Sequence, residues 1–309
     1  MAVTAVIKAN NGNLVLAQIA GKTLEAMLAN VVMPNLITPA TDVDPRPREL
    51  GDTIKCSFEP TLVAQDKAEN AENTYQAPDM VTSNISIDKW REASVRIGEL
   101  AQLFSVPNLG DTYAVAIGKA LARDIDSAIL ARYVDAGALE GAYGTALADS
   151  AILGCRRRLA VAEYPDEGRF LVLHPDIYNE ALALATYYDK SKIGDASALI
   201  KGSLGMIRSF QVFEDPRVKT TTSTGASRWH NMAFHKSAIA LAMVPMPVPE
   251  GTSAQVVVVS VTDSAGKPTG VSLRLQVWYD PDEKTNKMSG DVLFGIKTLR
   301  SAALIELRR

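Results

Sequence analysis

Two short segments near the start of the chain alternate between apolar and polar residues, the pattern of a half-buried β-strand. They cover residues 52–59 and 81–88, and their apolar faces would consist of Ile54, Cys56 and Phe58 in one and Val81, Ile85 and Ile87 in the other. The stretch between them is mostly polar and includes Asp66, Glu69, Glu72 and Asp79. A two-stranded ribbon alone buries too little apolar area to offset the entropy lost on ordering it. We therefore predict that the ribbon lies on another surface, and that this surface belongs to a second copy of the chain.

Helical periodicity predicts one helix over residues 14–32, ending at Met33-Pro34, and a longer one over residues 112–134 with Asp111 as its N-cap. Apolar residues recur every four positions in the longer helix, at Tyr113, Ile117, Leu121, Ile125, Ile129 and Tyr133. This spacing drifts by about 40° per step, so the two ends of the helix would meet different neighbours. Its expected solvent-facing side is marked by Lys119, Arg123 and Asp126.

The following segments first alternate between helix and strand and then become rich in strands. A helix capped by Asp149 is predicted to run to Ala162, and a buried strand over 169–173 leads into a helix opened by His174-Pro175-Asp176. The other predicted strands or apolar runs are 90–97, 211–213, 229–235, 238–244, 255–261, 271–279 and 292–307, the last interrupted by Gly295. A helical turn before Pro107, a turn over 263–266 and a stiff connector with Pro39, Pro45 and Pro47 join these elements.

Composition places the chain among ordinary soluble proteins and narrows its partners. It has 309 residues, 47% of them apolar and 22% charged, with a formal net charge of −3. A slightly acidic chain is not expected to coat nucleic acid electrostatically, although it can enclose nucleic acid without gripping it. Cys56 and Cys155 lack metal-ligand spacing and are expected to be small apolar residues in a reducing compartment. The start of the chain lacks the pattern of a secretory signal, and we predict no membrane span.

Few residues suggest catalytic chemistry. His174 and Asp176 are the candidates for an α/β enzyme site, but Pro175 between them is more simply explained as the first residue of a helix with Asp176 complementing its dipole. The run Arg156–Arg158 lacks the flanking basic or aromatic residues of a nucleic-acid patch, so a solvated face or salt bridges between subunits is favoured. We predict no catalytic, cofactor-binding or metal-binding residue, and no cofactor.

Taken in order, these segments resemble the major capsid protein of tailed bacteriophages, with the Hong Kong 97-type fold. The resemblance spans nearly the whole chain and is closest to the coat proteins of short-tailed phages. The segments that carry it are Gly51–Ile54, Ile85–Lys89, the helix over 112–134, Phe170–Tyr178, Met232–Leu241, Tyr279-Asp280, Gly290–Gly295 and Ala302–Glu306.

This resemblance implies an α+β fold with five named parts. They are an N-terminal arm (1–50), an extended β-hairpin or E-loop (51–92), a peripheral domain with a long spine helix (93–148, plus a strand from about 271–300), an axial α/β domain (149–270) and closing strands (271–309). It also implies a subunit that assembles into hexamers and pentamers of an icosahedral shell around double-stranded DNA, without sequence-specific binding. The implied partners are a scaffolding protein, a portal and, as an optional partner, a decoration protein. Assembly would take place in the host bacterial cytoplasm, and the product would be the virion capsid.

Three other hypotheses remain open at this point. An encapsulin-type compartment would share the fold but hold a protein cargo. A tail or connector component would form rings or tubes. An enzyme with a site near His174 and Asp176 would be a monomer or small oligomer with a pocket there.

Overall fold

The computed structural model describes residues 3–6, 13–40, 51–58, 81–98, 109–184, 205–223, 226–249, 254–262 and 268–309, with scattered positions between 62 and 76. Three predicted features lie outside these residues: the helical turn before Pro107, the part of the proline connector beyond Ala40, and the turn over 263–266.

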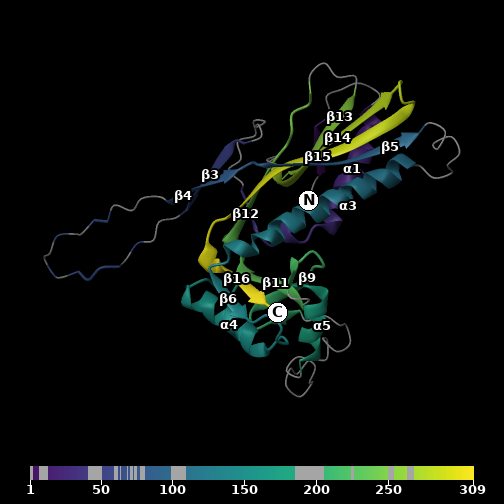
Figure 1. Cartoon of the computed structure of the whole chain (residues 1–309). Helices are drawn as coiled ribbons and strands as arrows, with labels where there is room; N and C mark the ends of the chain where they lie inside the picture. The colour runs from purple at the N-terminus through teal and green to yellow at the C-terminus, as the bar shows by residue number, and fades with distance from the viewer. Residues whose placement is uncertain are drawn as a thin grey trace.

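Both main sheets have seven strands among the described residues, and the larger sheet is the one whose seven strands include the long β14 (Pro268–Asp280) and β15 (Thr285–Thr298) (Figure 1). In spatial order its strands are β1 (Val3–Val6), β13 (Gln255–Thr262), β14, β15, β12 (Ile239–Val244) and β2 (Thr38–Pro39), with β5 (Lys89–Gly98) paired to the other edge of β15. The long strand β15 pairs with β14 and β5 through its first half and with β12 through its second half. It is therefore the central strand of the sheet, in contact with three other strands.

Two helices, α1 (Asn13–Asn30) and α3 (Leu109–Leu130), pack on each other and on one face of this sheet (Figure 1). The predicted row on α3 is confirmed, since Ile117, Leu121, Ile125 and Ile129 are all buried. The helix begins at Leu109, however, and its last predicted turn is a 3₁₀ helix, η2 (Ala131–Asp135). Asp111 is therefore not the N-cap: it lies in the first turn, where it complements the helix dipole and forms an ion pair with Lys22 (2.5 Å).

A glycine sets how closely α1 and α3 approach. A Cβ atom added at Gly118 would lie 2.3 Å from the backbone oxygen of Thr23, whereas one added at Gly21 would meet nothing within 4 Å. We expect Gly118→Ala to destabilise the subunit by about 1–3 kcal/mol because the helices must separate. Gly21→Ala, the matched control, is expected to stabilise it by about 0.5–1 kcal/mol through helix propensity.

Denaturant unfolding of both variants tests this expectation. If both substitutions stabilise the protein, the close contact between α1 and α3 is absent.

The second sheet lies at the other end of the molecule, with α4 and α5 beside it (Figure 1). Its strands, in spatial order, are β6 (Ala138–Gly141), β16 (Leu304–Arg308), β11 (Ala226–His235), β7 (Arg169–Leu173), β9 (Phe210–Glu214) and β8 (Met206–Ile207), with β10 (Thr220–Ser223) paired to β11. The helices α4 (Asp149–Val161) and α5 (Pro175–Ala183) supply Ile152, Leu159 and Ile177 to its core. The predicted strand–helix–strand unit is present, because β7 and β9 are parallel with α5 between them in sequence.

Strand pairing divides the chain differently from the sequence-based ranges. The range 149–270 contributes β12 and β13 to the larger sheet, whereas β16, from the closing range 271–309, belongs to the second sheet. These pairings join residues far apart in sequence, such as Met232 with Glu306, and local periodicity carries no information about them.

The predicted ribbon is confirmed as an antiparallel pair, β3 (Thr53–Phe58) with β4 (Val81–Ser86). It stands off the side of the larger sheet (Figure 1). Its base is not left for another copy to cover, because Ile54, Ile85 and Ile87 pack against β12 and β15 of the same chain. Gly295 permits this contact, since a Cβ there would lie 2.1 Å from the Ser86 backbone oxygen.

Candidate interaction surfaces

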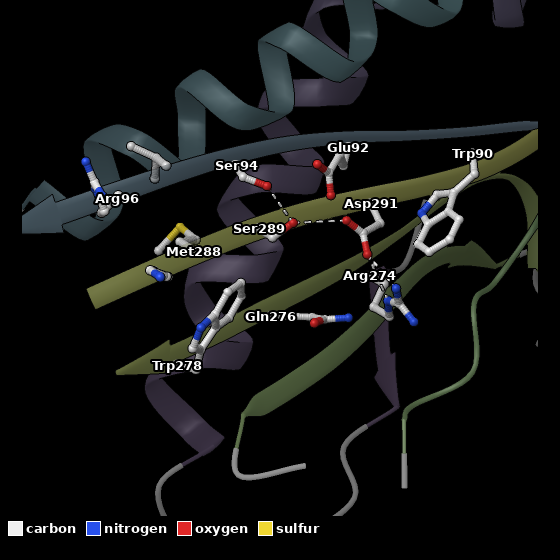
Figure 2. Close-up of a pocket in the computed structure, with 12 residues that line it drawn as sticks. Trp90, Glu92, Ser94, Arg96, Arg274, Gln276, Trp278, Met288, Ser289 and Asp291 are labelled. Carbon is white, nitrogen blue, oxygen red and sulfur yellow. Dashed lines mark hydrogen bonds and ion pairs between the residues drawn. The ribbon is translucent and has the colours of Figure 1, made fainter. Parts of the chain in front are cut away.

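The helices α1 and α3 cover one face of the larger sheet, and the described residues leave part of the other face open. Along β14, Leu273 and Leu275 belong to the core beneath the helices. Arg274, Gln276 and Trp278 alternate with them and therefore point the other way. Figure 2 shows these side chains around a hollow of about 570 Å³, together with residues of β5 and β15.

A buried ion pair shapes the floor of this hollow. Arg274 and Asp291 lie 2.5 Å apart on neighbouring strands, and Arg274 also donates to the backbone oxygen of Pro247 (3.0 Å). The Ser289 hydroxyl donates to Asp291 (3.0 Å) and contacts the Ser94 hydroxyl of β5 (2.9 Å) (Figure 2). Charges that are buried in this way require such partners. The network therefore holds three strands in one arrangement.

The rim of the hollow is suited to contact with protein. Trp90 is 53% exposed at one end, and Trp278 lies at the other (Figure 2). Exposed aromatic side chains beside polar groups are typical of protein–protein contact surfaces. The alternation along β14 was visible in the sequence and places Arg274, Gln276 and Trp278 on one face. The hollow was not predicted, because its lining residues come from separate strands and form no sequence motif.

Asp126 is not on a solvent-facing side, so that prediction was wrong. Its carboxylate is fully buried, accepts hydrogen bonds from the backbone N–H groups of Val32 (3.1 Å) and Met33 (3.0 Å), and forms an ion pair with Arg217 (2.9 Å). Arg217 also pairs with the buried Asp215 (2.7 Å), which follows β9. This cluster joins the segment just after α1, the C-terminal part of α3 and the second sheet.

Burial governs the ionisation of this cluster. It raises the pKa of the Asp126 carboxyl to about 6, although the Arg217 guanidinium and the two backbone donors favour the ionised form. The desolvation free energy of the ionised carboxylate is therefore larger than the stabilisation that Arg217 and the two backbone N–H groups give it.

His174 and Asp176 lie at the start of α5, where the His174 Nδ1 atom and the Asp176 carboxylate are 3.2 Å apart. The His174 side chain is the N-cap of α5 and accepts from the Asp176 backbone N–H (3.3 Å), while the Asp176 carboxylate is 63% exposed. This arrangement agrees with the explanation drawn from the sequence, in which Pro175 opens the helix and Asp176 lies in its first turn.

His230 lies in a denser polar cluster that the sequence did not reveal. Its ring contacts the Thr221 hydroxyl (2.9 Å) on one side and the Glu306 carboxylate (2.7 Å) on the other. Tyr143 also donates to Glu306 (2.8 Å), and burial together with this carboxylate raises the pKa of Tyr143 to about 12. Tyr133 stacks on the imidazole, with ring centroids 4.1 Å apart. The hydroxyl–imidazole–carboxylate order resembles that of a nucleophile triad, but these contacts enclose the ring and tie β10, β11 and β16 together.

The remaining candidates are structural or exposed. Cys155 is a buried free thiol of the second core, and burial raises its pKa to about 12. In the run Arg156–Arg158 all three residues are exposed, and Arg158 pairs with Glu140 of its own subunit. Among the described residues, no group of three or more His, Cys, Asp or Glu side chains could hold a metal ion. None of the described helices is long and apolar enough to cross a membrane.

Solved structures share this architecture. A chain in the structure of Mycobacterium phage Che8 is 18% identical in sequence to this chain, and the two superpose with a TM-score of 0.63 over 90% of each chain. The capsid of Ralstonia phage GP4 is 14% identical, with a TM-score of 0.63, and covers 88% of this chain and 86% of that chain. The capsid of cyanophage P-SCSP1u is 15% identical, with a TM-score of 0.61, and covers 90% and 87%. No curated protein sequence matches the chain.

A sheet beneath two long helices, a second α/β unit and a projecting ribbon define a Hong Kong 97-type capsid fold, as the resemblance predicted. A family model described as phage capsid protein matches residues 79–304, well over half of the chain. The chain belongs to this family and is a major capsid structural subunit of the virion. The compartment and enzyme alternatives are not favoured.

Proposed function

We propose that this subunit assembles with copies of itself into hexamers and pentamers, which close into an icosahedral shell around phage double-stranded DNA. Shell formation takes place in the host bacterial cytoplasm. A scaffolding protein and a portal take part, and a decoration protein is an optional addition. Membership of the phage capsid family supports this proposal.

The observation that carries the proposal is the ribbon on its fixed base. Ile54, Ile85 and Ile87 anchor β3 and β4 to the subunit's own sheet, with exposures of 1% or less. Between the strands, by contrast, Leu62 is 64% exposed and Tyr75 is 88% exposed. Large apolar side chains this exposed on a projecting segment are expected to be covered by a partner, because a ribbon alone is unstable in water.

The contrast between the buried base and the exposed residues of the ribbon suggests a role for each part of the subunit. In our proposal residues 51–92 form the E-loop, which contacts neighbouring subunits. The N-terminal arm predicted over residues 1–50 does not reach outward along its whole length, because α1 packs on α3 and on the larger sheet of its own subunit. The larger sheet with α1 and α3 acts as the peripheral domain. The second sheet with α4 and α5 acts as the axial domain, which gathers around the local symmetry axis. Each contact between subunits is weak, but repeated contacts make a closed shell stable.

Negative-stain electron microscopy of the purified protein, expressed with its scaffolding protein, tests the proposal. We expect closed particles of uniform diameter. Rings or open tubes would instead support a tail or connector role, and a stable monomer under assembly conditions would contradict shell formation.

A further inference from the structure

A basic pocket lies on the helix-covered side of the molecule, between α3 and β5. It has a volume of about 420 Å³, and its lining includes Lys89, Arg91, Arg132 and Lys219 with a single carboxylate, Asp124. Four cationic side chains around one hollow are unexpected in a chain whose net charge is −3. We propose that this pocket binds a backbone phosphate of nucleic acid, an inference that rests on the proposed enclosure of double-stranded DNA.

The cations come from separate elements that the fold brings together. Lys89 and Arg91 lie on β5, Arg132 lies on η2, and Lys219 lies just before β10. A backbone contact holds Arg132 in place, because its guanidinium donates to the Ile296 oxygen (2.9 Å). Side chains positioned from several elements lose less entropy on binding an anion than lysines that are free to move.

Part of the positive charge is available to an anion. Lys219 is held by the neutral Ser127 hydroxyl (3.2 Å). Arg91 pairs with Asp124 (3.2 Å), but both side chains are about half exposed, so water weakens this pair. Asp88 lies 3.1 Å from Lys89, and Asp135 lies 3.6 Å from Arg132, which offsets some of the charge. The pocket is therefore a weak anion site, suited to a wall that touches packaged DNA without gripping it.

The chemistry favours phosphate. A guanidinium presents a planar fork of donors that matches a phosphate, and lysines add point charges around it. A shell filled with DNA would also present a very high local concentration of phosphate, which can occupy a weak site.

The test compares two variants of the full-length, unassembled subunit. The variant K89Q/K219Q removes two charges from the pocket, and R156Q/R157Q removes two exposed charges from α4 as a matched control. Fluorescence anisotropy with a short labelled DNA duplex measures binding over a range of salt concentrations. We expect the pocket variant to bind about tenfold more weakly at low salt, with a salt dependence that is lower by about two phosphate contacts, while the control changes little.

Three results would overturn the inference: no duplex binding by the unaltered chain, equal weakening in both variants, or pocket-dependent binding of a peptide of residues 62–76 in place of the duplex. The last result would assign the pocket to an acidic protein segment. Electron microscopy of the unaltered protein, run in parallel, separates this outcome from failure of the proposed function. Closed shells without pocket-dependent DNA binding reject the pocket alone, whereas absence of shells rejects the proposed function.

Discussion

Deletion of residues 62–78 is expected to abolish closed shells while leaving the subunit folded. The deletion joins residue 61 to residue 79 and keeps β3, β4 and the buried contacts of Ile54, Ile85 and Ile87. It removes Leu62 and Tyr75, whose side chains are exposed and lie outside the core formed by the described residues. The free energy of unfolding should therefore change by less than about 1 kcal/mol, since a shorter loop costs little to close. Electron microscopy and denaturant unfolding measure the two effects separately.

A substitution at the base of the ribbon gives the contrasting control. Gly295→Val places a branched side chain where Ser86 backbone atoms lie, so it should displace β4 and destabilise the subunit by about 3 kcal/mol. The tip deletion and the base substitution are thus expected to differ in stability while both block assembly. Normal particles from the tip deletion would show that the ribbon does not connect neighbouring subunits.

Replacement of Asp126 is expected to loosen the joint between the two sheets. Asp126→Ala leaves the Val32 and Met33 N–H groups without their acceptor and removes one partner of Arg217. Unsatisfied buried donors each cost on the order of 1–3 kcal/mol, so we expect a loss of about 3 kcal/mol at neutral pH. A loss below about 0.5 kcal/mol, measured by denaturant unfolding, would show that the cluster does not stabilise the fold.

The more conservative Asp126→Asn gives a pH signature. Because the native pKa of Asp126 is raised from 3.8 to about 6, the folded state binds its proton more tightly than the unfolded state does. The stabilisation from protonation is complete below about pH 4 and is lost as the pH rises towards 6. Asn cannot titrate, so the stability of the unaltered protein relative to Asp126→Asn should fall by about 3 kcal/mol between pH 4 and 7. A difference that is flat across this range would contradict the raised pKa.

The same helix shows where sequence reasoning succeeded and where it failed. The row Ile117, Leu121, Ile125 and Ile129 was visible because large apolar residues recur at a helical spacing, and the structure buries all four. A second buried row, Gly118, Ala122 and Asp126, has the same spacing, but it was not recognised because its residues are small or charged. The role of this row is visible only in the packed structure, where Gly118 approaches Thr23 of α1 and Asp126 accepts from Val32, just after that helix.

Contacts between distant segments were the other limit. The strands were largely predictable, and Ile54 and Ile85, which the alternation placed on the apolar faces of the two segments, pair with each other in the ribbon. The partners of β12, β13 and β16 were not, since several pairings satisfy the same local pattern. The basic pocket was not predicted for the same reason. Its cationic residues are spread over positions 89 to 219, whereas the only basic cluster considered from the sequence was the contiguous run 156–158.

A cryo-electron microscopy map of the assembled particle at side-chain resolution tests the central idea most directly: completion of the subunit's protruding hairpin by its neighbours. We predict density for residues 62–76 seated on an adjacent subunit, with Tyr75 and Leu62 covered there. Density that folds this segment back onto its own subunit, or leaves it pointing into solvent in a closed shell, would contradict the account.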